Sequence, residues 1–303
     1  MASGAYAVSN GGTIEDNKVT IVEVGPRDGL QNQKGFVDTT LKIRLIDLLS
    51  ECGFRRIEAT SFVSPRWVPQ MADAADVMQG ISRLPDIVYS VLTPNLKGVE
   101  MAVATHADEV AIFASASESF SRKNINCSIA ESLERFRPVM EAARAAAIPV
   151  RGYVSCVIEC PYEGPVATGA VARVTSDLLQ LGCHEVSLGD TIGRGRPETV
   201  AAMLDAVLGV SPASRLAGHY HDTNGRACES IEVSLEKGLR VFDSAIAGLG
   251  GCPYAPGAEG NVDTIKVDTL LRQRGFATGL DRAKLETAAT LARSLKTGVD
   301  SLS

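Results

Sequence analysis

The sequence predicts an α/β protein of the (β/α)8 barrel class, and two observations support this. Short runs rich in apolar and β-branched residues recur eight times, with about 25 to 40 residues between their centres. The segments between these runs carry the apolar spacing of amphipathic helices, and repeated strand–helix alternation is typical of such a barrel. The strand-like runs span residues 18–24, 55–60, 86–92, 109–114, 148–156, 184–189, 215–221 and 240–247.

The intervening segments also contain start and stop signals for helices. In the first of them, apolar residues recur on one helical face over residues 41–52, and Gly53 follows as a stop. Ser128 and Glu131 have the spacing of a capping box and predict the start of a later helix. Gly182 ends a third apolar segment. Helices are therefore expected between successive strands.

We expect the 303 residues to form one domain, a TIM barrel with additional C-terminal helices. Residues 1–16 have the composition of a loose tail, and residues from about 262 to 303 have the pattern of a closing helix and a further C-terminal helix. The alternative is a doubly wound open sheet. However, the turn after the first strand is GPRDG, and the chain contains neither a G-x-G-x-x-G turn nor a P-loop.

Composition and charge exclude several classes of protein. The formal charge of −6 makes nucleic acid an improbable partner, and the lack of an apolar run of eighteen residues argues against a membrane span. The seven cysteines have no C-x-x-C spacing, which predicts reduced thiols, with Cys156 and Cys160 as core or loop residues. No leader pattern is visible at the start of the sequence, so a cytoplasmic location is expected.

Charged and metal-ligand residue types follow five of the eight strand-like runs. Active sites of (β/α)8 barrels lie at the carboxyl ends of the strands, so these residues are expected at one rim. They are Arg27 and Asp28 after the first run, Glu58 near the end of the second, Asp190 after the sixth, His219 and His221 at the end of the seventh, and Asn261 after the eighth.

The histidine pair indicates a metal site. The chain has only four histidines, and His219 and His221 stand two residues apart, so their side chains point to the same side of a strand. Two imidazoles, the carboxylate of Asp28 and the amide oxygen of Asn261 would leave open positions around a divalent cation. A set of nitrogen and oxygen ligands without a thiolate favours Mg²⁺ or Mn²⁺ over Fe²⁺ or Zn²⁺.

Each of these residues also has a structural interpretation. A lone histidine is more often a hydrogen-bonded core residue, and Asp28 could simply be a turn residue. Asn261 could be the N-cap of the closing helix. Glu58 and Asp190 could form structural ion pairs.

Seven stretches of the chain together resemble a known family. In order, they are VEVGPRDGLQNQ, IEATSFVSPRWVPQM, RKNINCS, RGYVSCVIECPYEG, SLGDTIG, HYHDT and GLGGCPYAPGAEGN. They are similar to the 3-hydroxy-3-methylglutaryl-CoA lyases, which belong to the DRE-TIM metallolyases. The resemblance runs from about residue 19 to 275, and GPRDGLQN and GLGGCPYAPG are its most specific parts.

The resemblance implies a reaction and a role for each matched residue. The reaction is metal-dependent cleavage of a branched 3-hydroxyacyl-CoA to acetyl-CoA and a β-keto acid, acetoacetate for the standard substrate. Asp28, His219, His221 and Asn261 would hold the metal, with Mg²⁺ or Mn²⁺ as the cofactor, and His219 is also a candidate catalytic residue. Arg27 would stabilise the enolate oxygen.

Further residues complete the predicted site. The resemblance makes Cys252 the proton donor to the enolate, whereas without it Cys252 would be an ordinary loop thiol. Glu58 and Asp190 would relay protons or orient their neighbours. Gln31, Lys34 and Thr191 are, with Arg27, candidate substrate-binding residues, although Lys34 is equally compatible with a solvated surface charge. The implied assembly is a homodimer, and the implied pathway is leucine degradation.

Several residues depart from the family pattern near the barrel mouth. They raise the possibility of a different acyl group, and they are Glu159, Arg194, Arg196, Asn224, Arg226 and Glu259. Two other functions remain open. One is a Claisen-type synthase of the isopropylmalate or homocitrate type, which forms the carbon bond instead of cleaving it. The other is a barrel that binds an acyl-CoA without turnover.

Overall fold

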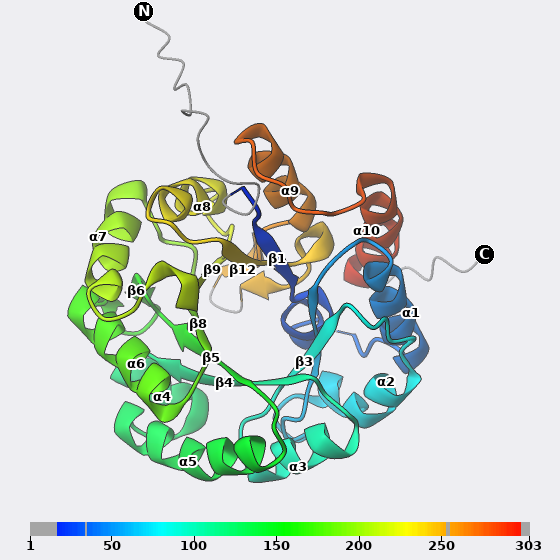
Figure 1. The fold of residues 1–303 in the computed structure, drawn as a ribbon, viewed down its shortest axis with the longest axis horizontal. Helices are drawn as coiled ribbons and strands as arrows, with labels where there is room; N and C mark the ends of the chain where they lie inside the picture. The colour runs from blue at the N-terminus through cyan, green and yellow to red at the C-terminus, as the bar shows by residue number, and fades with distance from the viewer. Residues whose placement is uncertain (1–16, 34, 253–254, 298–303) are drawn as a thin grey trace, which may run out of the picture.

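A closed barrel of eight parallel strands forms the centre of the molecule, with helices around it (Figure 1). The computed structural model describes residues 17–33, 35–252 and 255–297. Within these residues the strand order is β1-β10-β9-β8-β5-β4-β3-β2, and the barrel closes where β1 pairs with both β10 and β2. The predicted fold class is confirmed. The barrel strands are β1 (Thr20–Glu23), β2 (Arg56–Ser61), β3 (Val88–Leu92), β4 (Glu109–Ser115), β5 (Val150–Ser155), β8 (Glu185–Asp190), β9 (Leu216–Tyr220) and β10 (Val241–Ser244).

The helices surround the barrel in the order that the sequence indicates. The expected capping box is present, with Ser128 accepting from the backbone of Glu131 and the Glu131 side chain accepting in return. Gly182 is the C-cap of its helix, with φ of +119°, and Gly53 follows two residues after the C-cap Glu51, with φ of +94°; a residue with a Cβ would be strained at either position. The helices are α1 (Thr39–Ser50), α2 (Ala74–Gly80), α3 (Leu96–Ala104), α4 (Glu118–Ile125), α5 (Ile129–Ala145), α6 (Thr168–Leu181), α7 (Pro197–Leu208), α8 (Ala227–Glu236), α9 (Thr264–Gln273) and α10 (Arg282–Thr297).

Some elements were not foreseen from the sequence. A short antiparallel pair, β6 (Glu159–Cys160) and β7 (Gly164–Pro165), stands between β5 and α6. A second pair joins β11 (Gly251–Cys252) to β12 (Ala255–Glu259) after the last barrel strand. The first barrel strand leads directly into one turn of π-helix, η1 (Gly25–Gly29). All three additions follow the carboxyl end of a strand, where the candidate site is expected.

The interior of the barrel is polar to an unusual degree. Barrel interiors are normally filled by branched apolar side chains. Here Arg151 of β5 is buried and bonds Glu185 at 2.7 Å and Asp243 at 2.8 Å. Apolar residues such as Val110 and Leu188, which alternate with the polar ones along the strands, belong to the main hydrophobic core. That core therefore lies between the strands and the helices.

No helix in the described part of the chain combines the length and the apolar character that a membrane span requires. Cys156 and Cys160 are buried free thiols, as the sequence predicts. The predicted loose tail, residues 1–16, lies outside the described residues.

Candidate active site

The GPRDG turn projects two charged residues over the end of the barrel. The amide of Gly25 donates to the Glu23 carboxylate at 2.8 Å, and the amide of Asp28 donates to the carbonyl of Val24 at 2.8 Å. A Cβ on Gly25 would lie 2.6 Å from a Glu23 oxygen, so a larger residue would displace the Glu23 carboxylate that holds the turn. These contacts fix the conformation of the turn, and that conformation sets the positions of the Arg27 and Asp28 side chains.

Arg27 is buried and held by two carboxylates. Its Nε bonds Glu58 at 2.7 Å and its Nη1 bonds Asp28 at 2.5 Å. Burial alone would lower the pKa of Arg27, but the charges of Glu58 and Asp28 outweigh it and raise that pKa above its ordinary value. The guanidinium also lies 5.4 Å from the centre of the Tyr153 ring. Arg27 is therefore a permanent cation with a fixed orientation.

Asp28, His219 and His221 form the one cluster among the described residues that could hold a metal ion. One ligand atom from each lies within 4.8 Å of the others. His219 Nε2 is 3.9 Å from Asp28 Oδ2, while its Nδ1 lies 3.1 Å from Asp243. The Nδ1 of His221 is buried without a hydrogen-bond partner among the described residues. An orphaned imidazole nitrogen next to a carboxylate fits a divalent cation.

The protonation states of this cluster also suit a metal. Burial raises the pKa of Asp28, but Arg27 and the two histidines more than offset this and lower that pKa to about 2. Burial and the neighbouring His219 lower the pKa of His221 to about 4. At neutral pH Asp28 is therefore ionised and His221 is neutral, the forms in which both act as ligands.

His219 has a carboxylate partner on its other side. Burial alone would lower its pKa, but the bond to Asp243 and the charges of Asp243 and Asp28 raise it. An Nδ1–H that donates to Asp243 leaves Nε2 free to face Asp28. A carboxylate behind a histidine in this way orients the ring and increases its basicity as a ligand.

Asn261 lies against the same cluster, with its amide nitrogen turned toward it. Nδ2 donates to Asp28 at 2.8 Å, and the residue pairs with His221 in an antiparallel bridge. A ligand role would require the amide to turn so that its oxygen faces the ion. The alternative role as a helix cap is wrong, because Asp263 is the N-cap of α9 and accepts from Ile265.

The remaining predicted acids stand around this cluster. Glu58 bonds Arg27 and accepts from the Tyr153 hydroxyl at 3.2 Å, and its other oxygen is buried without a partner among the described residues. Burial raises the pKa of Glu58. Asp190, at the end of β8, accepts from the amides of Arg194 at 3.1 Å and Gly195 at 2.6 Å, and burial raises its pKa as well.

The predicted substrate-binding residues are less closely associated with the cluster. Thr191 accepts from the amide of Cys156 at 2.8 Å. Gln31 is half-buried just after η1, and no hydrogen bond joins its side chain to the cluster among the described residues. Lys34 lies outside the described residues, as does the side chain of Cys252. The roles of all four stay predictions.

Three site residues were not identified from the sequence. Asp243, Arg151 and Tyr153 are buried beneath the metal-type cluster, and Asp243 pairs in register with His219 across β10 and β9. The signal for Arg151 and Asp243 was a charged residue inside an otherwise apolar strand, in VRGYV and VFDS. Such a residue is buried on the inner side of the barrel only if it is paired there.

Comparison with known proteins identifies the family. A family model described as HMGL-like matches residues 18–292. The chain belongs to the HMGL-like family. This family is metal-dependent, in agreement with the cluster of Asp28, His219 and His221.

Relatives of this family member cover nearly its full length. It is 59% identical to the Gallus gallus protein named hydroxymethylglutaryl-CoA lyase, mitochondrial. The 273 matched residues cover 90% of this chain and 92% of the relative. A solved HMG-CoA lyase from Brucella melitensis is 63% identical with a TM-score of 0.92, over 93% of this chain and 99% of that one. The resemblance stated from the sequence motifs is confirmed.

A more distant structure adds a ligand. The HMG-CoA lyase from Acinetobacter baumannii is described in complex with coenzyme A and 3-methylmalate; it is 36% identical, with a TM-score of 0.88 over 95% of this chain and 94% of that one. The carboxyl transferase domain of Rhizobium etli pyruvate carboxylase, at 15% identity and a TM-score of 0.70, shares the fold alone.

The predicted cytoplasmic location is contradicted by these relatives. The proteins from Gallus gallus, Rattus norvegicus and Arabidopsis thaliana are named mitochondrial, although one from Danio rerio is named cytoplasmic. The prediction relied on the absence of a leader pattern, which carries too little information for such a conclusion.

Proposed function

We propose that this protein is a divalent-metal-dependent carbon–carbon lyase that cleaves 3-hydroxy-3-methylglutaryl-CoA to acetyl-CoA and acetoacetate. The observation that carries the proposal is the convergence of Asp28, His219 and His221 beside the buried guanidinium of Arg27. The names of the relatives, at 55–59% identity over most of the chain, support the same substrate.

The proposed metal ligands are Asp28, His219, His221 and, after its amide turns, Asn261. Nitrogen and oxygen donors without a thiolate favour Mg²⁺ or Mn²⁺. A cation bound there supplies a Lewis acid that acidifies the substrate hydroxyl and fixes its geometry. Asp243 holds the His219 ring in position from behind, at 3.1 Å.

The reaction then needs a base, an anion stabiliser and an acid. The C3 hydroxyl loses its proton, its oxygen becomes the ketone of acetoacetate, and the C2–C3 electron pair passes into the thioester as an enolate. We assign the base to Asp190, whose pKa burial raises above its ordinary value, with His219 as the alternative. Arg27 faces the enolate oxygen, oriented by Glu58 at 2.7 Å. Cys252 returns a proton to the enolate carbon, which gives acetyl-CoA.

Other parts of the proposal rest on the family resemblance. These are CoA-ester contacts through Gln31, Lys34 and Thr191, a homodimer, and a place in leucine degradation. Light scattering of the purified protein tests the dimer directly, since a monomer mass at micromolar concentration would exclude it.

The decisive experiment follows acetyl-CoA release from 3-hydroxy-3-methylglutaryl-CoA before and after treatment with EDTA. Activity should be lost with the metal and return when Mg²⁺ or Mn²⁺ is added. A parallel reaction contains acetyl-CoA and a series of 2-oxo acids. Free CoA released only in that reaction would replace the lyase by a synthase, and binding without either product would indicate a non-catalytic barrel.

A further inference from the structure

The loop after β1 and the loop after β2 are joined by the side chain of Gln70. This residue lies in a short 3-10 helix, η2 (Pro69–Met71), and is buried. Its Oε1 accepts from the amide of Val37 at 2.9 Å, and its Nε2 donates to the carbonyl of Gly35 at 2.8 Å. One side-chain amide thus satisfies two backbone groups and holds residues 35–37, between η1 and α1, against η2.

A buried ion pair fixes the backbone of η2 in turn. The Nζ of Lys42, near the start of α1, bonds the Asp73 carboxylate at 2.7 and 2.9 Å and also donates to the carbonyl of Gln70. Asp73 accepts from Thr39 at 2.7 Å, and the ammonium lies 4.4 Å from the centre of the Phe36 ring. A buried ammonium is costly unless it is compensated, as it is here by a carboxylate, a carbonyl and a ring. We call Lys42, Gln70 and Asp73 the latch.

The reactive groups of the GPRDG turn are anchored independently of the latch. Arg27 bonds Glu58 at 2.7 Å. At the end of η1, a Cβ on Gly29 would lie 2.6 Å from the Cβ of Leu249, so the turn is also packed closely on the segment after β10. Loosening the latch should therefore leave Arg27 and Asp28 in place.

The residues just beyond η1 depend on the latch more directly. Four residues, 31–34, connect Leu30 to Gly35. Leu30 is fully buried, and Gly35 is held by Gln70 at 2.8 Å. Gln31 is half-buried on this connection, just past the carboxyl end of β1. The latch therefore fixes the far end of the connection that carries Gln31.

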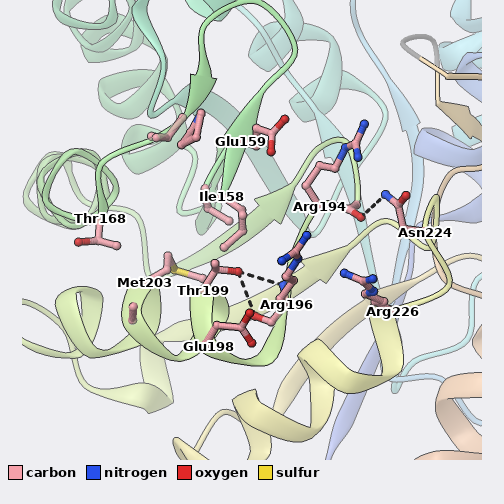
Figure 2. Close-up of a pocket in the computed structure, with 15 residues that line it drawn as sticks. Ile158, Glu159, Thr168, Arg194, Arg196, Glu198, Thr199, Met203, Asn224 and Arg226 are labelled. Atoms are coloured by element: carbon pink, nitrogen blue, oxygen red, sulfur yellow. Dashed lines mark hydrogen bonds between the residues drawn. The ribbon is translucent and has the colours of Figure 1, made fainter.

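The latch lies across the barrel mouth from a second pair of joined loops. In the strand order, β1 and β2 are neighbours, and β5 and β8 stand opposite them. An arginine-lined cavity of about 430 Å³ opens between the segments after β5, β8 and β9, bordered by Arg194, Arg196 and Arg226 (Figure 2). There Asn224 donates to the carbonyl of Gly193 at 2.7 Å and joins the loops after β9 and β8 (Figure 2). Side chains therefore tie neighbouring rim loops together on both sides of the mouth.

We propose that Gln70 is a positioning residue for substrate binding, which fixes residues 35–37 and, through them, the turn that carries Gln31. This inference rests on the proposed function, in which an acyl-CoA ester enters at this mouth. A connection that is already fixed loses less conformational freedom when a ligand binds. Because Arg27 and Asp28 do not depend on the latch, its loss weakens binding and leaves the chemical step unchanged.

The test begins with Gln70→Met, which keeps the length of the side chain, removes both bonds to residues 35–37 and leaves no buried charge. KM for 3-hydroxy-3-methylglutaryl-CoA, and Kd for acetyl-CoA from calorimetry, should rise about 5- to 20-fold, with kcat within about twofold of the wild type. Hydrogen–deuterium exchange at the Val37 amide should become faster. Lys42→Met should act in the same direction, and adding it to Gln70→Met should weaken binding little further, because both act through one segment.

Asp47→Ala is the matched control. Asp47 also joins α1 to the segment after α2, where it accepts from the amide and the hydroxyl of Ser82 at 2.7 and 3.2 Å. It lies toward the end of α1, away from the mouth, so the variant should lower stability without changing KM or Kd.

The outcomes separate this proposal from the lyase assignment. Faster exchange at Val37 with unchanged KM and Kd in Gln70→Met would reduce the latch to a structural role and overturn the proposal. A fall in kcat alone, or no binding of acetyl-CoA by the wild type at millimolar concentration, would overturn it as well. If the wild type binds acetyl-CoA but does not cleave the ester, the lyase assignment fails, and the Kd of the Gln70 variant still decides the positioning role.

Discussion

The two ends of the barrel contain the same residue types but use them differently, one in a structural network and the other in a candidate reactive site. At the amino-terminal end, Arg56 bonds Glu109 at 3.1 Å and Glu185 at 2.9 Å. Arg151 also bonds Glu185, at 2.7 Å, and His184 also bonds Glu109, at 2.6 Å. Among the described residues, every side-chain nitrogen and oxygen buried in this network has a partner. The charges there neutralise one another and hold the strands in register.

The carboxyl-terminal end leaves its groups incomplete. Glu58 and His221 each keep a buried atom without a partner in the described part of the chain, and Asp28 faces two imidazoles. Unsatisfied buried groups cost stability, and beside a cluster of potential metal ligands they favour a binding role. The difference teaches that residue type does not distinguish a structural network from a reactive one; the completeness of its hydrogen bonding does.

The largest expected effect comes from removing the carboxylate at the incomplete end. Asp28→Ala should lower lyase activity by about a thousandfold or more, because the variant loses an anionic ligand and the metal's charge stabilisation. Arg27 keeps its bond to Glu58, so folding should persist. Acetyl-CoA release and metal titration measure the effect, with exposed Asp205→Ala as control. Unchanged metal affinity in the Asp28 variant would exclude the proposed centre.

Disrupting the fully hydrogen-bonded network at the amino-terminal end should lower stability and leave metal binding unchanged. Arg56→Met leaves Glu109 and Glu185 undercompensated, and the free energy of unfolding should fall by about 3–5 kcal/mol. The adjacent Arg55 is exposed, and its ion pair with Asp86 is long, at 3.6 Å. Arg55→Met should therefore lower the free energy of unfolding by less than about 1 kcal/mol. Urea denaturation measures both variants. If Arg56→Met weakened metal binding as strongly as folding, the two ends would not be independent.

The pKa values of two buried glutamates are shifted in opposite directions. Burial raises the pKa of Glu23, beneath the GPRDG turn, from 4.5 to about 7, whereas the bonds to His184 and Arg56 offset burial and lower the pKa of Glu109. Between pH 4.5 and 7 the unfolded chain ionises Glu23 while the folded protein keeps it protonated. Stability contributed by Glu23 is therefore lost as the pH rises through this window.

The expected loss is on the order of 2–3 kcal/mol. Glu23→Gln cannot ionise and should remove this decline, which denaturation at pH 5 and pH 8 would detect. An equally steep decline in the variant would assign the pH dependence to other groups.

The smallest expected effect concerns the residue behind His219. Asp243→Asn weakens the partner that orients the imidazole, and metal affinity should fall about 10- to 100-fold. Ser187 donates to the same carboxylate at 2.8 Å, so Ser187→Ala removes a contact without changing its charge and should alter affinity far less. Metal titration compares the two. Equal losses would show that packing, not the carboxylate on His219, sets the affinity.

The sequence predicted the barrel because its strands have distinct apolar runs and its helices have local caps. Gly53 and the Ser128 capping box depend only on near neighbours, so they were readable from the chain. The rim residues were predicted because parallel strands all end on the same side. Arg27 and His219 needed no knowledge of register to be placed there.

What could not be predicted depends on pairing between strands distant in sequence. Arg151 meets Asp243 across 92 residues, and His219 meets Asp243 only because β9 and β10 pair in one register. Glu159 falls in a hairpin with no strong strand pattern. The arginine cavity was visible only as scattered departures from the family pattern, because Arg194 and Arg226 converge through two different loops.

Arg151 belongs to both layers of the barrel interior at once. One guanidinium bonds Glu185 in the lower network and Asp243 in the upper one. A single inherited change at this codon would therefore disturb both the structural network and the position of His219. A screen for inactive alleles should therefore recover position 151 alongside residues that touch the substrate. Efforts to redirect specificity have more freedom in the arginine-lined cavity, where exposed side chains vary without loosening the strands.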